Sequence, residues 1–195
     1  MATPRLTAID GEQLRHALLS QLQQPYLSRI TIVSYHYNDF DLVMGPRHPR
    51  GSGTALVRLL ERAASAGIPL TLVTRDALVE TKRPRGFQDW YDGLKRLHLA
   101  GATVRLHPSL HAKVYLFESE GNRYFFSVGS SNLTHQGMGY LWAECNVKGN
   151  HEGEYELVLR RAAQIATERE SIDFASWDAT ARRDGALPSG SPPRQ

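Results

Sequence analysis

The middle of the sequence holds four side chains suited to acting on a phosphate ester: His111, Lys113, Ser130 and Asn132. The alternating pattern and the β-branched and aromatic content of residues 110–117 predict a strand, and side chains two apart on a strand share a face. Residues 123–128 should return as a second strand after a polar turn at 120–122. This hairpin would bring an imidazole, an ammonium, a hydroxyl and a carboxamide to one edge of a sheet, where a phosphodiester could use all four.

The chemistry these groups offer needs no metal ion. A neutral imidazole can attack phosphorus while an acid protonates the leaving oxygen, and histidine suits both roles near neutral pH. An ammonium and hydrogen-bond donors can stabilise the charge of the transition state. The remaining histidines show no metal-ligand spacing. We therefore expect no metal site and no cofactor.

The motif His111-x-Lys113-x4-Glu118, followed by Gly129-Ser130-x-Asn132, resembles the signature of the phospholipase D superfamily, H-x-K-x4-D and G-S-x-N. The resemblance implies an α/β fold, a phospholipase D-like mixed sheet flanked by helices on both faces. It implies that His111 is the nucleophile and forms a phosphohistidine. It also implies that the non-bridging oxygens are held by Lys113, Ser130 and Asn132, with Gly129 allowing close approach of the backbone.

Two acidic residues bear on this resemblance. Glu118 stands where the family has Asp, and strand parity places it on the face opposite His111, so we expect it to affect stability more than chemistry. Glu144 lies twelve residues after Asn132, on a strand predicted at 141–147 and on the same face as Asn146. Members of the family carry an acid at about this place, which makes Glu144 the candidate that orients His111. A solvated strand charge is the alternative for Glu144.

Basic residues gather in two Pro-containing segments that we interpret as loops. They are candidates for contact with a phosphate backbone: Arg47, Arg50, Lys82, Arg83 and Arg85. Positive loops beside a phosphate site suit DNA or RNA as a partner. Solvated loops without a partner are the alternative.

The order of the expected elements predicts a single domain over residues 1–175, within a chain of 195 residues. Further helices are expected at 10–24, 55–66, 87–100 and 156–169, and further strands at 29–35, 68–74 and 102–107. Alternation of strand, helix and strand favours a parallel pair for the first two of these strands. Residues 176–195 drift into Ala, Arg, Gly, Ser and Pro, and we expect a disordered tail there.

Composition gives a default location. Cys145 is the only cysteine, so no disulfide can form within the chain, and a reducing compartment is the simpler expectation. The first ten residues lack the apolar core of a signal peptide, and no run approaches the length of a membrane span. We therefore expect a cytoplasmic protein without a membrane span.

The chain contains one H-x-K motif, whereas the site of the family uses two, so a homodimer with a shared site is the economical expectation. The predicted function is a metal-independent phosphodiesterase, an endonuclease cleaving DNA or RNA. Two alternatives stay open. One is a phospholipase or phosphatidyltransferase. The other is a nucleic-acid-binding subunit of a larger restriction or defence complex.

Overall fold

The computed structural model describes residues 6–38, 42, 55–79, 86–134, 136–139 and 144–187. Its strands are β1 (Thr7–Ile9), β2 (Leu27–Ser34), β3 (Leu70–Arg75), β4 (Thr103–His107), β5 (Lys113–Ser119), β6 (Arg123–Gly129), β7 (Asn146–Gly149) and β8 (Ile172–Asp173). Its helices are α1 (Gly11–Leu22), α2 (Leu56–Ser65), α3 (Phe87–Leu99), α4 (Glu152–Thr167) and α5 (Phe174–Arg183).

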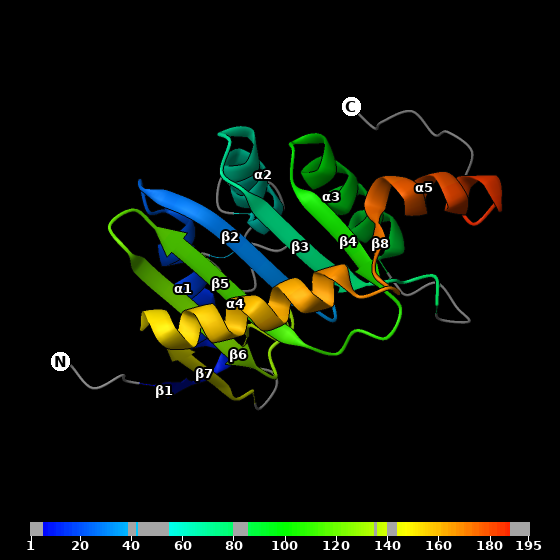
Figure 1. Ribbon diagram of the computed structural model, residues 1–195. Coiled ribbons are helices and arrows are strands. Elements are labelled where there is room, and N and C mark those ends of the chain that lie inside the picture. The colour runs from blue at the N-terminus through cyan, green and yellow to red at the C-terminus, as the bar shows by residue number, and fades with distance from the viewer. Residues whose placement is uncertain are drawn as a thin grey trace.

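One mixed sheet runs through the described part of the chain in the order β1-β7-β6-β5-β2-β3-β4-β8. The pairs β2–β3 and β3–β4 are parallel, as the strand–helix–strand order predicts, and the remaining pairs are antiparallel. Helix α4 lies across one face, while α1, α2 and α3 lie on the other (Figure 1). Each face has its own apolar core, which confirms a mixed sheet with helices on both sides.

Local signals account for the elements next to the site. Helix α1 begins with a capping box: the Asp10 carboxylate accepts the Gln13 N–H at 2.7 Å, and the Gln13 side chain accepts the Asp10 N–H at 3.1 Å. The β5–β6 hairpin turns at Gly121 and Asn122, both with positive φ. Two central residues of this conformation match the twist of an antiparallel pair, so the turn fixes the register of the hairpin.

A disordered tail was expected from residue 176, but the structure has a helix there, α5. Asp173 caps helix α5 by accepting the Ala175 N–H at 2.9 Å, and the helix runs to Arg183. Phe174 and Trp177 are 2% and 5% exposed and belong to the core beside α3. The Ala- and Arg-rich composition of this region did not indicate a helix, which packs on the domain through these aromatic side chains. Residues 188–195 lie outside the described part.

Three strands differ from expectation. The strand expected at 141–147 is β7, Asn146–Gly149, and residues 141–143 lie outside the described part. The short strands β1 and β8 were not predicted, because two or three residues carry no periodic signal and depend on pairing with β7 and β4. None of the helices in the described ranges is long and apolar enough to cross a bilayer.

Candidate active site

His111 and Lys113 lie together where β5 begins. His111 is exposed and belongs to the segment before the strand, whereas Lys113 is its first residue and only 7% exposed. The Lys113 ammonium donates to the His111 carbonyl oxygen at 2.8 Å, and its Nζ lies 3.4 Å from His111 Nδ1. A solvent-exposed imidazole and a buried ammonium therefore lie side by side. His111 was expected to be part of the strand, but it precedes the first residue of β5.

The segment after β6 is attached to the end of β2, beside these two side chains. The Leu133 N–H donates to Ser34 Oγ at 2.9 Å, and the Asn132 carboxamide oxygen accepts the His36 N–H at 3.2 Å. With that oxygen occupied, the Asn132 Nδ2 amide is left without a hydrogen-bond partner among the described residues. Asn132 is thereby presented as a donor.

Buried polar groups hold the backbone between Ser130 and Asn132. Asn146 is fully buried; its side-chain oxygen accepts the Ser131 N–H at 3.2 Å, and its amide donates to Ser131 Oγ at 2.8 Å. The Tyr115 hydroxyl donates to the Ser131 carbonyl at 2.7 Å, and burial raises the pKa of that phenol well above its usual range. Tyr115 is therefore a neutral donor, and Ser131 is bound on both sides.

Gly129 makes a close backbone approach possible at the end of β6. A Cβ at this position would lie 2.3 Å from Asn146 Oδ1 and 2.6 Å from both Asn146 Cα and the Cys145 carbonyl oxygen. No side chain fits these distances, so β6 and β7 can come this close only with glycine. The glycine of the motif thus serves the strand pair that supports Ser130.

Glu144 lies just before β7 and contacts Ser130, not His111. The Ser130 hydroxyl donates to the Glu144 carboxylate and accepts the Cys145 N–H at 2.9 Å. No hydrogen bond joins Glu144 to His111 in the described part of the chain. The structure therefore brings Glu144 to the site, but through a different neighbour from the one expected.

Glu144 also acts on Lys113 through its charge. Burial lowers the pKa of the Lys113 ammonium, because desolvation disfavours the charged form, and the Glu144 carboxylate opposes this shift. The carboxylate thus helps to keep the buried Lys113 ammonium protonated. That cation is the group expected to bind phosphate oxygens.

Two residues at neighbouring strand ends complete the surroundings of His111. The Tyr35 ring lies 5.2 Å from the His111 ring and 5.2 Å from Lys113 Nζ, measured to its centroid. The Arg75 guanidinium lies 4.8 Å from the same centroid and donates to the Tyr35 hydroxyl. Tyr35 directly follows β2 and Arg75 is the last residue of β3, and neither was among the predicted site residues.

Glu118 follows the expected strand parity. Lys113, Tyr115 and Phe117 face the α1–α3 side of β5, whereas Glu118 faces α4 and pairs with Arg29 at 3.4 Å. It is therefore remote from the reacting groups. The candidate backbone-binding residues all lie outside the described part of the chain: Arg47, Arg50, Lys82, Arg83 and Arg85. Within the described part, no group of three or more His, Cys, Asp or Glu residues is arranged to hold a metal ion.

Residues 18–166 match the family model described as "Cardiolipin synthase, PLD-like domain". Among solved structures, Nuc from Salmonella typhimurium, a phospholipase D family member, is similar at 14% identity and a TM-score of 0.58, covering 88% of this chain and 97% of Nuc. NucT from Helicobacter pylori gives 14% and 0.59, covering 88% of this chain and 99% of NucT.

A larger solved structure shares the fold. Phosphatidylserine synthase from Haemophilus influenzae is 12% identical with a TM-score of 0.58, and the match covers 94% of this chain but 46% of the synthase. No curated protein matches the chain. The matches to Nuc, NucT and the synthase show a common fold, and the family model covers most of the sequence.

Proposed function

The chain belongs to the phospholipase D superfamily, and from this premise we propose that it is a metal-independent endonuclease, cleaving DNA or RNA through a phosphohistidine. The family, the mixed α/β sheet and the enzyme class are as the motif predicted. The observation that carries the proposal is the exposed His111 imidazole beside the buried Lys113 ammonium, 3.4 Å from Nδ1 to Nζ.

In the proposed first step, an unprotonated ring nitrogen of His111 attacks phosphorus, a bond from nitrogen to phosphorus forms, and the bond to the leaving oxygen breaks. Lys113 and the Asn132 amide bind the non-bridging oxygens as negative charge develops on them. A second imidazole, protonated at the start, gives its proton to the leaving oxygen. Water then displaces the histidine, and the second imidazole takes a proton from that water.

The second imidazole comes from a second copy of the chain in this proposal. Of the eight histidines, only His111 is followed two residues later by Lys. One imidazole cannot start both neutral and protonated, so a two-fold axis beside the site supplies the missing group. The near-complete coverage of Nuc and NucT supports this one-motif architecture, since the chain spans less than half of phosphatidylserine synthase.

A nucleic acid is favoured over a lipid by the basic residues of the two segments interpreted as loops. Their charges would bind successive phosphates of one backbone, a contact that a single lipid headgroup cannot use. These residues are grouped in two clusters, 47–50 and 82–85. Their contact with a nucleic-acid backbone is part of the proposal, because both clusters lie outside the described residues.

Parallel incubation of the pure protein with labelled DNA, RNA and phospholipid, each with and without EDTA, tests the substrate class. We expect nucleic-acid cleavage that EDTA does not abolish, trapped 32P on His111, and neither in His111→Ala. His16→Gln, an exposed change on α1, is the matched control and should keep full activity. Selective turnover of the lipid, or activity lost in EDTA and restored by Mg2+, would contradict the proposal.

Mixing of subunits tests the shared site. In re-equilibrated mixtures of wild-type and His111→Ala chains, activity should fall as the square of the wild-type fraction. Equal mixing should leave about a quarter of the activity if the chains associate at random. A linear decline, or full activity from a monomer at the assay concentration, would show that each chain works alone.

A further inference from the structure

The segment that carries His111 has little slack. It joins β4 to β5, and in the sheet these strands are separated by β3 and β2 (Figure 1). Three spacings between neighbouring strands amount to about 14 Å. Residues 108–112 make this crossing, and the path from His107 to Lys113 can reach roughly 20 Å when fully extended. The position of His111 therefore depends strongly on how the two ends of this segment are held.

His107 holds the first end. Its imidazole is buried, and Nδ1 accepts the Ser109 N–H at 3.1 Å. Its carbonyl oxygen accepts the Leu110 N–H at 3.5 Å, and Leu110 is buried in the core under α4. A ring nitrogen that accepts an amide proton carries no proton itself, so the ring proton is on Nε2.

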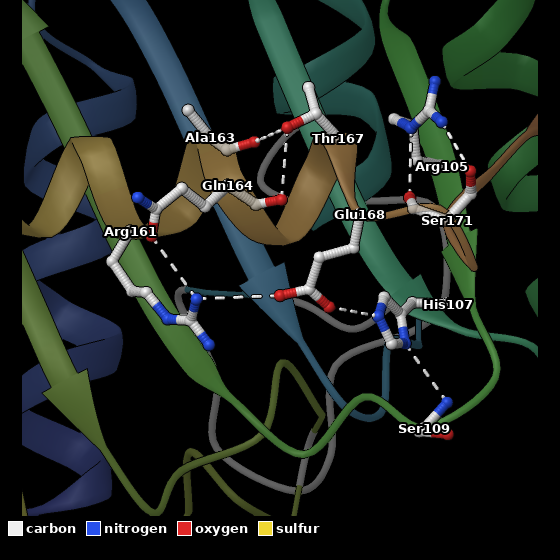
Figure 2. A network of polar contacts seen from close by, with 9 residues as sticks. All are labelled: Arg105, His107, Ser109, Arg161, Ala163, Gln164, Thr167, Glu168 and Ser171. Carbon is white, nitrogen blue, oxygen red and sulfur yellow. Dashed lines mark hydrogen bonds and ion pairs between the residues drawn. The ribbon is translucent and has the colours of Figure 1, made fainter.

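Nε2 of His107 points at the end of helix α4. It lies 2.8 Å from the Glu168 carboxylate, which is also 3.6 Å from the Arg161 guanidinium. Figure 2 shows Glu168 reaching from the end of α4 to one side of the imidazole, with Ser109 on the other side. The chain after Glu168 is bound to β4 in turn, since the Arg105 guanidinium donates to Ser171 Oγ at 3.0 Å and to its carbonyl at 2.5 Å.

We propose that His107 is a positioning residue for the reaction. By accepting the Ser109 N–H, the imidazole fixes the start of the 108–112 segment and so sets where His111 stands beside Lys113, while its bond to Glu168 orients the ring from the end of α4. His107 itself touches no reacting atom. The inference rests on the proposed role of His111 as nucleophile.

Two substitutions separate the two sides of the imidazole. Asparagine places an amide oxygen near the site of Nδ1 and can still accept the Ser109 N–H, whereas glutamine reaches toward the site of Nε2 and cannot. We expect His107→Gln to lower the single-turnover rate of phosphohistidine formation about 10- to 100-fold, with KM within about twofold, as for a small displacement of a reacting group. His107→Asn should keep the rate within about threefold of wild type, and His16→Gln should leave it unchanged.

Amide hydrogen exchange provides a readout independent of turnover. The Ser109 amide should exchange faster in His107→Gln than in His107→Asn. If both variants lose activity only in proportion to their folded fraction, the proposal is wrong and His107 has only a structural role. The same conclusion follows if the Ser109 amide exchanges equally fast in both variants. A wild-type protein without phosphohistidine would refute the proposed function, and exchange at Ser109 would still decide whether His107 fixes the segment.

Discussion

Asn146→Ala should damage the site without removing any group that touches the substrate. The substitution deprives the buried Ser131 N–H of its acceptor and breaks the bond from Asn146 Nδ2 to Ser131 Oγ. An unsatisfied buried donor costs about 1–3 kcal/mol, and the lost side-chain volume adds to this. We expect the free energy of unfolding to fall by about 2–4 kcal/mol, a large share of the roughly 5–15 kcal/mol typical of a domain.

Urea unfolding measures this loss, and the melting temperature should drop by roughly 5–15 °C for a chain of this size. Ser131→Ala keeps the backbone N–H bond at position 131 but leaves the buried Asn146 Nδ2 without its acceptor, so it should cost about 1–3 kcal/mol, less than Asn146→Ala. Asn150→Ala, an exposed change beyond β7, should stay within about 0.5 kcal/mol of wild type. Turnover per folded Asn146→Ala molecule should also fall, because Ser130 and Asn132 flank Ser131. Stability equal to wild type, or a larger loss in Ser131→Ala, would refute the reasoning.

Two further predictions concern the carboxylates. Glu144→Gln removes a charge that raises the pKa of Lys113, so that pKa should fall further, which the 15N shift of Lys113 Nζ followed against pH measures; an unchanged or raised pKa would contradict this. Glu118→Ala removes a half-exposed ion pair with Arg29 and should cost about 0.2–1 kcal/mol in urea unfolding, with kcat unchanged. Loss of turnover in a stably folded Glu118→Ala protein would show that the strand parity is misunderstood.

The sequence predicted most of what local patterns determine. The hairpin of β5 and β6 and the parallel pair β2–β3 follow from alternation, turn residues and the order of the elements. The prediction of a disordered tail was wrong for helix α5, because the burial of this helix depends on aromatic residues of α3 that lie far away in the sequence. Glu144 was expected to orient His111, yet its neighbour is Ser130, since contact between side chains from separate segments has no sequence spacing to reveal it.

The residues that hold the site in place lie at comparable positions in the sheet. Ser34, Asn146 and His107 each occupy the end or the beginning of a strand, and each binds the backbone of a segment that carries motif residues. The motif therefore indicates which groups can bind a phosphate, whereas Ser34, Asn146 and His107 determine how precisely those groups are positioned. Because a displacement of about 1 Å can cost roughly a hundredfold in rate, a chain with an intact motif but without these supports should bind substrate and turn it over slowly. Activity should follow the buried supports as much as the motif itself.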